Sequence, residues 1–547
     1  MTQATTLRLQ RMVQVGVVVV GLLLGLRAYR ALILADMPLH ADEAGHALPA
    51  ARMTLALRQG DTSRFVAASL QEVVWPFMHP WLLTASFLAF GISARVARAC
   101  SLLTFGAGLC LLPPLARRLS SHDPARAGVA PPPLGWLSVA MAISAAPWVL
   151  VCTVMSEPLG MFLTLLVLLV AAEARTRDTL GWHALAGSIA ALAFFTKYSH
   201  GLPLMAALPL AAAWPSPRSR IPQVLATLAG ALTPVLAWAL VILWPNPQRG
   251  SEILGALANR DEGLRGFSDF LFYPKTVLNQ VGAPAGLAVL LLLAVTAFRR
   301  ETARLPALLL AAGTHVLLTS HPNKQERYLF PALPVMLVMA ETEAARLLGR
   351  RRWLPALWSA LTAALLVAGN PLARVDEQAQ GASDLRGARS IVSYVADNVA
   401  YGEPVLFLGT AGLLPHLALT WELIEREQRE PEVDLLPFPG SSGWDPRYRA
   451  GYPPEPRSDY DVSLLQALAT GRYRCLVTLR LGEHSPFRPA WLAKWDAWGQ
   501  NYVEAADRRA AEGGYLLTSA RSFPEDDAVV RIFARSAARP TRARGSE

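Results

Sequence analysis

Long runs of apolar residues, many of them close to the length of a membrane helix, fill the first two thirds of the chain. The hydrocarbon core of a bilayer is about 30 Å thick, so a spanning helix needs about 20 predominantly apolar residues. Runs of this kind lie at residues 12–34, 77–91, 96–116, 134–152, 156–172, 180–196, 200–214, 221–244, 282–298, 305–320, 328–345 and 353–369. The pattern predicts an α-helical polytopic membrane domain over residues 1–370, with about 11 to 13 transmembrane helices.

Beyond residue 370 the pattern changes to shorter amphipathic and alternating segments. Their periodicity predicts helices at 385–399, 413–429 and 489–498, strands at 404–408, 473–481, 515–520 and 529–534, and a Pro- and Gly-rich loop at 437–456. We therefore predict a small soluble α/β domain over residues 371–537 and a disordered tail over residues 538–547.

Composition supports this division and limits the classes of function. Of the 547 residues, 53% are hydrophobic and only 17% are charged, whereas about a quarter are charged in an ordinary soluble protein. The net charge of +10 does not indicate nucleic acid, because much of the basic excess lies in short loops between apolar runs. The sequence contains no glycine-rich phosphate loop. The four cysteines lack metal-ligand spacing and are interpreted as packing residues.

The basic loops predict the orientation of the chain. They contain Arg117 and Arg118, Arg175 and Arg177, Arg218 and Arg220, Arg299 with Arg300 and Arg304, and Arg350 to Arg352, and basic loops face the cytoplasm. We expect an inner-membrane protein with a retained first helix, a cytoplasmic N-terminus and a periplasmic C-terminal domain. This scheme requires that one of the two runs between residues 77 and 116 is not a full crossing.

The Asp42-Glu43 pair lies just beyond the first apolar run, where the chain leaves the bilayer and enters a long loop over residues 36–76. One interpretation is a solvated turn or helix cap, since Asp is a good N-cap residue and Glu suits a first helical turn. The other is a catalytic base, because ionisable groups held at a membrane cleft are often functional.

Further ionisable residues fall on the same predicted outer face. They are His46, His79, Glu157, Lys197 and the segment His321 to Tyr328, which contains Lys324, Glu326 and Arg327. An alternative interpretation is that Glu157 begins a helix before Pro158 and that the lysine and histidines are ordinary interface residues. A carboxylate in such a cleft suits proton transfer from a hydroxyl or amine, and cations suit a phosphate leaving group.

Several motifs, taken in order, resemble the GT-C superfamily of glycosyltransferases that use polyprenyl-phosphate sugars. These motifs are Asp42-Glu43 after Arg27-x-x-Arg30, His79-Pro80, Gly91-Ile92-Ser93-Ala94-Arg95 with Arg98, Ser156-Glu157-Pro158-Leu159 and Phe195-Thr196-Lys197-Tyr198. The resemblance covers about residues 12–370 and extends to bacterial relatives of protein O-mannosyltransferases and lipid A aminoarabinose transferases. The segment from His321 to Pro331 also resembles a motif of dolichol-phosphate-mannose-dependent mannosyltransferases.

The resemblance implies roles for individual residues. Asp42 matches the acid that acts as general base or orients the acceptor, with Glu43 as its neighbour, and Glu157 matches a second outer-face acid. Candidates for holding the donor phosphate are Lys197, Lys324, Arg327, Arg27 and Arg30. For Arg27 and Arg30 the alternative is that they extend to the membrane interface. Candidates for substrate binding are His46, His79, His321, Glu326 and Tyr328. Many relatives have Pro-Pro where this chain has His79-Pro80, which leaves the role of His79 open.

These observations together predict a membrane glycosyltransferase that moves a sugar from a polyprenyl-phosphate carrier to a hydroxyl or amine of a lipid, glycan or protein. A single displacement would invert the anomeric configuration. No cofactor is implied with certainty, and assistance by a divalent metal is left open. Two alternatives are a transporter or flippase of lipid-linked sugar, a class that commonly shows repeated halves and interrupted helices, and a non-catalytic scaffold for envelope assembly.

Overall fold

The computed structural model describes residues 3–34, 39, 41–71, 76–120, 138–139, 142–143, 151–214, 218–245, 267–299, 304–320, 326–348, 386–399, 404–409, 414–429, 433–435, 468, 472–482, 484 and 496–535. The chain forms two compact units. The first unit comprises Met1–Ala35, Thr62–Gly91 and Arg95–Ala379, and the second comprises Asp36–Asp61, Ile92–Ala94 and Gln380–Glu547. The predicted boundary at residues 370–371 lies outside the described residues.

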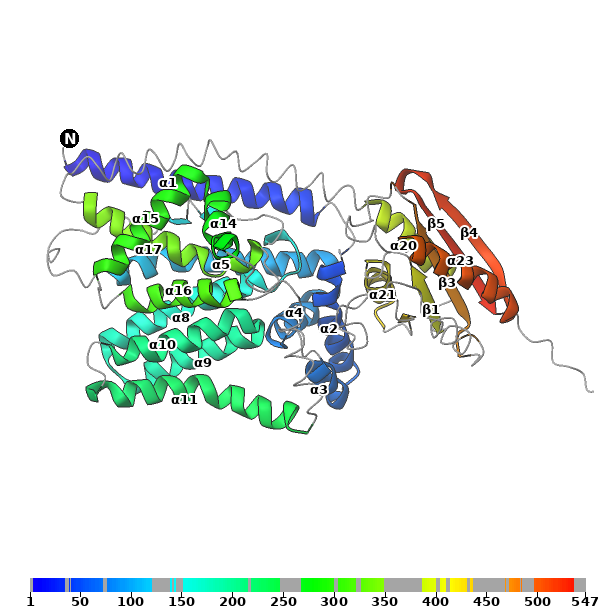
Figure 1. The fold of residues 1–547 in the computed structure, drawn as a ribbon, viewed down its shortest axis with the longest axis horizontal. Helices are drawn as coiled ribbons and strands as arrows, with labels where there is room; N and C mark the ends of the chain where they lie inside the picture. The colour runs from blue at the N-terminus through cyan, green and yellow to red at the C-terminus, as the bar shows by residue number, and fades with distance from the viewer. Residues whose placement is uncertain are drawn as a thin grey trace, which may run out of the picture. The chain divides into compact units, whose positions relative to one another are not determined.

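The first unit is built from helices (Figure 1). They are α1 (Gln3–Ala28), the π-helical η1 (Tyr29–Ile33), α3 (Thr62–Gln71), α4 (Met78–Phe90), α5 (Ala94–Ser120), α8 (Glu157–Arg177), α9 (Leu180–Thr196), α10 (Tyr198–Ala213), η3 (Arg218–Arg220), α11 (Ile221–Trp238), η4 (Ala239–Leu243), α13 (Phe267–Phe270), α14 (Phe272–Val281), α15 (Ala283–Arg299), α16 (Leu305–Ser320), η6 (Glu326–Leu329) and α17 (Leu333–Leu348). The runs predicted at 180–196 and 305–320 coincide with α9 and α16. The first helix begins at Gln3 rather than at residue 12.

Three described helical segments are long and apolar enough to cross a membrane, namely Ala94–Ser120, Glu157–Arg177 and Arg218–Leu243. At a rise of 1.5 Å per residue, α8 is about 30 Å long, which equals the thickness of the bilayer core. Helix α4 has 13 residues and a length of about 20 Å, so it fits the requirement that one run between residues 77 and 116 does not cross. The total number of spans stays a prediction, because the run at 353–369 and most of the run at 134–152 lie outside the described residues.

Helices α9 and α11 approach each other closely because a glycine on each faces the backbone of the other. A Cβ atom on Gly187 of α9 would lie 2.1 Å from the carbonyl oxygen of Thr227, and one on Gly230 of α11 would lie 2.0 Å from that of Ala184. Small residues at such interfaces let membrane helices pack by van der Waals contact where the hydrophobic effect gives little. The two glycines therefore fix the spacing of α9, whose C-terminal end leads into the candidate site.

Replacing Gly187 by Ala should lower the melting temperature of the purified protein by several degrees. The added methyl group has no space at Thr227, and overpacking typically costs about 1–3 kcal/mol. Gly25 is the matched control, because a Cβ atom there meets nothing within 4 Å and Gly25→Ala should be neutral or slightly stabilising. Equal melting temperatures for the two variants, measured by thermal unfolding in detergent, would contradict the proposed packing role of Gly187.

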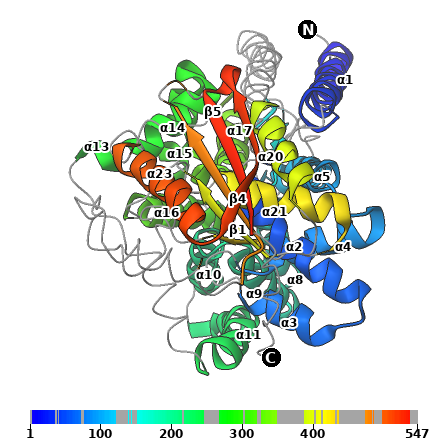
Figure 2. The ribbon, with the colours of Figure 1, turned by 90° about the vertical axis from the view of Figure 1, so that its right-hand side faces the viewer.

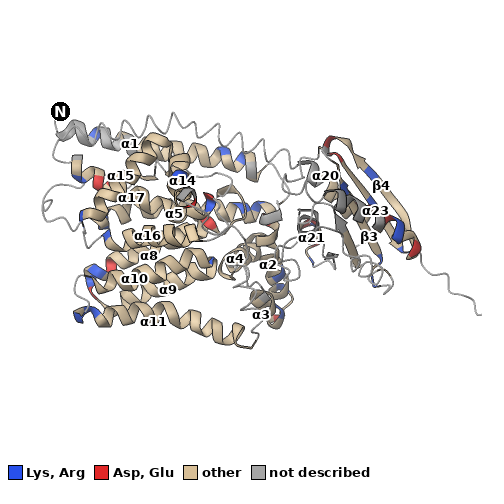
Figure 3. Ribbon diagram, in the orientation of Figure 1, with Lys and Arg blue, Asp and Glu red and all other residues tan. Residues whose placement is uncertain are grey.

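Charged residues of the first unit gather near the ends of its long helices, whose middle parts are largely uncharged (Figure 3). Glu173 near the C-terminus of α8 pairs with Arg118 at 2.6 Å and with Arg177 at 2.5 Å. Asp178, which follows α8, pairs with Arg220 before α11 at 2.7 Å. These arginines belong to the basic loops that we assign to the cytoplasm, and the structure brings them together at the end of α8 opposite Glu157.

A second charge cluster joins the ends of α15, α16 and α17. Glu343 is fully buried and pairs with Arg304 at 2.5 Å, Arg346 at 2.8 Å and Arg299 at 3.4 Å. Because a buried carboxylate needs charged partners to offset its desolvation, the arginines of these basic loops also stabilise helix packing.

The second unit contains a five-stranded sheet with helices on both faces. Its elements are α2 (Ala41–Arg58), α20 (Arg386–Asn398), β1 (Val405–Gly409), α21 (Leu414–Glu427), β2 (Val433–Leu435), β3 (Cys475–Leu481), α23 (Asp496–Glu512), β4 (Tyr515–Phe523), η9 (Pro524–Asp526) and β5 (Ala528–Arg535). The strand order is β2-β1-β3-β5-β4. Strands β2, β1 and β3 are parallel, whereas β5 is antiparallel to both β3 and β4.

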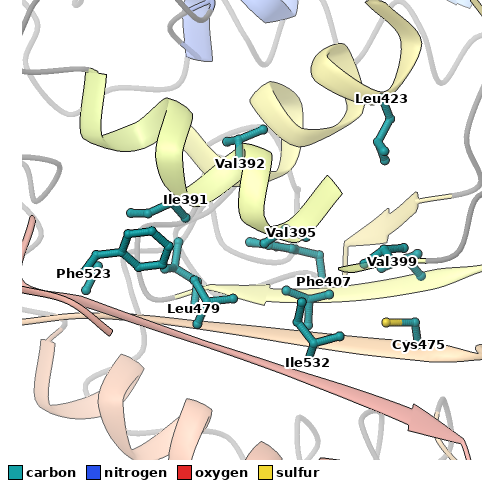
Figure 4. Packing of buried hydrophobic residues seen from close by; sticks show 14 of the residues in the cluster. Ile391, Val392, Val395, Val399, Phe407, Leu423, Cys475, Leu479, Phe523 and Ile532 are labelled. Carbon is teal, nitrogen blue, oxygen red and sulfur yellow. The ribbon is translucent and has the colours of Figure 1, made fainter. Parts of the chain in front are cut away.

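Alternation along β3 assigns the helices to the two faces of the sheet. Val477 and Leu479 belong to a buried cluster with Ile391 of α20 (Figure 4). Between them, Thr478 points to the other face, where its hydroxyl donates to Asp507 of α23 at 2.8 Å. Because side chains alternate across a strand, α20 covers one face and α23 the other, as Figure 2 shows.

Most predicted elements of this domain are confirmed. The short strand β2, which has only three residues, was not predicted. Helix α23 continues to Glu512, whereas the predicted helix ends at residue 498. The sequence of α23 is mostly polar, and its buried side includes the small residues Ala506 and Ala510, which give a weak apolar signal. The predicted loop at 437–456 and the tail at 538–547 lie outside the described residues. The structure thus has the predicted class, a helical membrane domain with a small α/β domain.

Candidate functional site

Glu157 is the first residue of α8 and is almost completely buried, with 1% of its surface exposed. Pro158 follows it, in a position where a missing N–H costs no helical hydrogen bond. A carboxylate in the first turn interacts favourably with the helix dipole. The alternative interpretation, that Glu157 begins a helix, is therefore correct, but it does not account for the burial of a charged side chain.

Lys197 lies at the break between α9 and α10. Its backbone is extended, with φ of −164° and ψ of 132°, so it ends one helix and precedes the next. This break directs the side chain to the N-terminus of α8, where Nζ lies 2.8 Å from Oε1 of Glu157. Lys197 is 15% exposed, which makes this ion pair far less screened than a surface pair.

The short helix η6 contributes Arg327 and Tyr328 to the same place. Nε of Arg327 lies 3.9 Å from Oε1 of Glu157. Nζ of Lys197 lies 4.4 Å from the ring centroid of Tyr328, and the Arg327 guanidinium carbon lies 5.8 Å from it. Cations at such distances are attracted to the ring face. Lys197 and Arg327 therefore flank one carboxylate, and the ring of Tyr328 lies close to both cations.

Glu326 does not join this cluster but helps to hold η6 in place. Its side chain is exposed, and Oε1 accepts a hydrogen bond from Nδ2 of Asn279 at 3.3 Å. Nε2 of Gln280 donates to the Glu326 carbonyl at 3.2 Å. These two bonds from α14 fix the backbone beside Arg327, and a substrate-binding role for Glu326 stays a prediction.

Two buried histidines lie in the electrostatic neighbourhood of Glu157. His79 of α4, a residue predicted from the sequence, is 3% exposed and interacts with Glu157. His200 of α10, which was not predicted, is 4% exposed and interacts with both Lys197 and Glu157. The sequence signal that could have found His200 is a polar residue only three positions after Lys197, inside an apolar run.

The charge of the cluster determines what it can bind. Lys197 and Arg327 bring two positive charges and Glu157 one negative charge, which leaves one net positive charge among these three side chains. The two cations offset the desolvation of the buried carboxylate. The remaining positive charge suits the binding of a monoanion. The aromatic face of Tyr328 orders both cations without neutralising either of them.

The remaining predicted residues are not part of the described cluster. Arg27 and Arg30 have exposed side chains on α1 and η1, which agrees with the alternative that they extend to the interface. His321 and Lys324 lie outside the described residues. Their predicted roles in binding stay predictions.

The Asp42-Glu43 pair begins α2, which belongs to the second unit and packs against α21. Glu43 and His46 are buried, at 3% and 5% exposure. A solvated turn is therefore wrong for Glu43, which lies in the first turn of α2 as expected. Asp42 is not the predicted N-cap, because the helix already begins at Ala41. The side chain of Asp42 lies outside what the structure describes. Its catalytic role stays a prediction.

Within the described ranges, the structure contains no group of three or more His, Cys, Asp or Glu side chains placed to hold a metal ion. The cluster at Glu157 pairs a carboxylate with cations, an arrangement that suits an anionic ligand.

Comparison with solved structures identifies the fold. The chain superposes on ArnT from Cupriavidus metallidurans bound to undecaprenyl phosphate with a TM-score of 0.61 at 16% sequence identity, covering 95% of this chain and 97% of that one. The superposition on the apo state of the same protein has a TM-score of 0.60. The oligosaccharyltransferase AglB from Archaeoglobus fulgidus, in complex with an inhibitory peptide and a dolichol-phosphate, gives 0.51 at 11% identity over 96% and 74% of the two chains. The scan against family models and the search of curated proteins found no match. The chain therefore shares the fold of these two proteins.

Proposed function

We propose that the protein is a membrane glycosyltransferase that takes a sugar from a polyprenyl-phosphate carrier. The observation that carries the proposal is the buried Glu157 carboxylate held by Lys197 and Arg327 at one end of a membrane-length helix. The fold supports it, because it is shared with ArnT, whose structure contains undecaprenyl phosphate.

The net charge of the cluster matches the donor. A sugar joined to a carrier through a phosphodiester has one negative charge, and the three charged side chains leave one net positive charge. When the bond between the anomeric carbon and the phosphate oxygen breaks, a second negative charge develops on the departing phosphate. Lys197 and Arg327 would stabilise that charge by hydrogen bonds and Coulomb attraction, which strengthen as the bond breaks.

The reaction is a single displacement. An acceptor hydroxyl or amine attacks the anomeric carbon as the phosphate leaves, the configuration inverts, and a base takes the acceptor proton. We assign the base to Asp42 from its motif, with Glu43 as its neighbour. Glu157 is already paired with two cations, so its proposed role is to orient Lys197 and Arg327 rather than to accept a proton.

The proposed reaction takes place on the periplasmic side of the inner membrane, with a lipid, glycan or protein as acceptor. The arginines at the opposite end of α8 support this orientation, because basic loops face the cytoplasm. A carrier-linked donor needs no nucleotide sugar on that side.

Binding of undecaprenyl phosphate tests the proposal directly. Lys197→Met should weaken binding at least tenfold relative to the native protein in nanodiscs, because a charge-assisted contact to the phosphate is lost. The matched control is Lys275→Met, since Lys275 is exposed on α14 of the same unit and should leave binding unchanged. Native mass spectrometry or thermophoresis gives the affinities. A native protein that does not bind undecaprenyl phosphate, or equal affinities in both variants, would refute the proposed function.

A further inference from the structure

Several buried polar atoms beside the Glu157 ion pair have no hydrogen-bond partner among the described residues. They are both ring nitrogens of His200, Oε2 of Glu157 and Oγ of Ser156. All three residues are more than nine-tenths buried. Buried polar atoms in native proteins nearly always have a partner, so a set of unsatisfied atoms at one place indicates a ligand or ordered water.

Ser156, Glu157 and Gly160 lie close together at the N-terminal end of α8. Gly160 lies one helical turn after Ser156 and Glu157, and residues three and four apart share a helix face. A Cβ atom on Gly160 would lie 2.2 Å from Nδ1 of His200, so the ring rests directly on the α8 backbone at this turn. The glycine therefore seats His200 on α8 within one helical turn of Glu157, with which the ring interacts electrostatically.

The hydrogen-bonding capacity of the set excludes a phosphate as its ligand. An ionised carboxylate only accepts hydrogen bonds, a neutral imidazole donates one and accepts one, and a serine hydroxyl does both. A phosphate oxygen only accepts, so it cannot satisfy Oε2 of Glu157. Hydroxyl groups both donate and accept, and a polyhydroxyl ligand would satisfy every atom of the set.

We propose that Ser156, Oε2 of Glu157 and His200 form the subsite that binds the hydroxyl groups of the donor sugar. The inference rests on the proposed function and specifies it. Oε1 of Glu157 faces Lys197 and Arg327, which hold the phosphate, while Oε2 and His200 receive the sugar. One carboxylate thus separates the phosphate side from the sugar side, as required by a donor in which the two groups are directly bonded.

The experiment compares two affinities in the full-length protein. One is for undecaprenyl phosphate alone, and the other is for undecaprenyl phosphate linked to a hexose, an N-acetylhexosamine, a pentose or an amino-pentose. The native protein should bind at least one of the sugar-bearing lipids more tightly than the bare lipid. His200→Leu should reduce the ratio of the affinity for the sugar-bearing lipid to the affinity for the bare lipid about tenfold. It should leave the affinity for the bare lipid unchanged. His200→Gln, which keeps a donor and an acceptor, should restore part of the ratio.

His183 of α9 provides the matched control. It is also 4% exposed, and its Nε2 likewise has no hydrogen-bond partner among the described residues, but it lies beside Asp178 and Arg220. His183→Leu should leave both affinities unchanged, which separates a sugar subsite from a general effect of losing a buried histidine. Thermal unfolding of each variant verifies that it folds.

Two results would overturn the subsite. Either no sugar-bearing lipid binds more tightly than the bare lipid, or His200→Leu keeps the native ratio, in which case the polar atoms hold water only. Both leave the proposed function intact if bare undecaprenyl phosphate still binds in a Lys197-dependent manner. Failure of the native protein to bind the bare lipid would instead refute the proposed function, together with the subsite that rests on it.

Discussion

Sugar transfer should fall at least 100-fold when Asp42 is replaced by Asn. The amide has the shape of the carboxylate but cannot accept the acceptor proton, and general-base catalysis typically contributes about 10²–10⁴ in rate. Asn and Asp have similar helix propensities, so α2 should keep its structure. Initial rates with a radiolabelled lipid-linked sugar measure the loss, and the affinity for undecaprenyl phosphate should stay at its native value.

Asp61→Asn is the control for Asp42→Asn. Asp61 follows α2 in the same compact unit and has no part in the proposed chemistry, so its amide variant should transfer sugar at the native rate. Glu43→Gln tests the neighbouring acid in the same assay. Persistent transfer in both Asp42→Asn and Glu43→Gln would show that the base lies elsewhere in the chain.

Glu157→Gln should destabilise the free protein and make it respond more strongly to undecaprenyl phosphate. The variant leaves Lys197 and Arg327 without their shared carboxylate, and breaking a buried ion pair costs about 3–5 kcal/mol. The bound phosphate would then replace the missing negative charge. The melting temperature without lipid should therefore fall, and the increase on adding the lipid should exceed that of the native protein. Sugar transfer should also decrease, because the two cations lose their orientation.

Glu173→Gln provides the comparison at the opposite end of α8. Glu173 pairs with Arg118 and Arg177, whose side chains are 41% and 57% exposed, and exposed pairs contribute little to stability. Its melting temperature and lipid response should stay near the native values. If Glu157→Gln behaved like Glu173→Gln, the carboxylate would not organise the phosphate site.

Helix α9 illustrates how far sequence reasoning extends in the membrane unit. Its bounds, Leu180 to Thr196, follow from an apolar run that ends at a lysine, because length and hydropathy are local properties. Helix α23 shows the opposite case. Its polar sequence concealed a helix to Glu512, because a helix packed through alanines shows little apolar periodicity.

The residues of the candidate site likewise include some that the sequence identifies and one that it does not. Glu157, Lys197 and Arg327 could be selected from the sequence because charged residues at the ends of apolar runs are conspicuous. His200 was not selected, because its only signal is a polar residue three positions after Lys197 inside an apolar run, and that signal does not show which helix the ring contacts. Its position follows from Gly160, whose missing side chain lets the ring reach α8, and contacts between helices are not encoded in local periodicity.

The sequence by itself determined the apolar runs, the basic loops between them, the strand and helix pattern of the C-terminal domain and the kinds of side chain available for chemistry. These properties depend on neighbouring residues in the chain. Only the tertiary structure decided that Lys197 and Arg327 share one oxygen of Glu157, that His200 packs on α8 at Gly160, and that α2 belongs to the unit of the α/β domain. Packing between distant segments sets these contacts, so no local pattern specifies them.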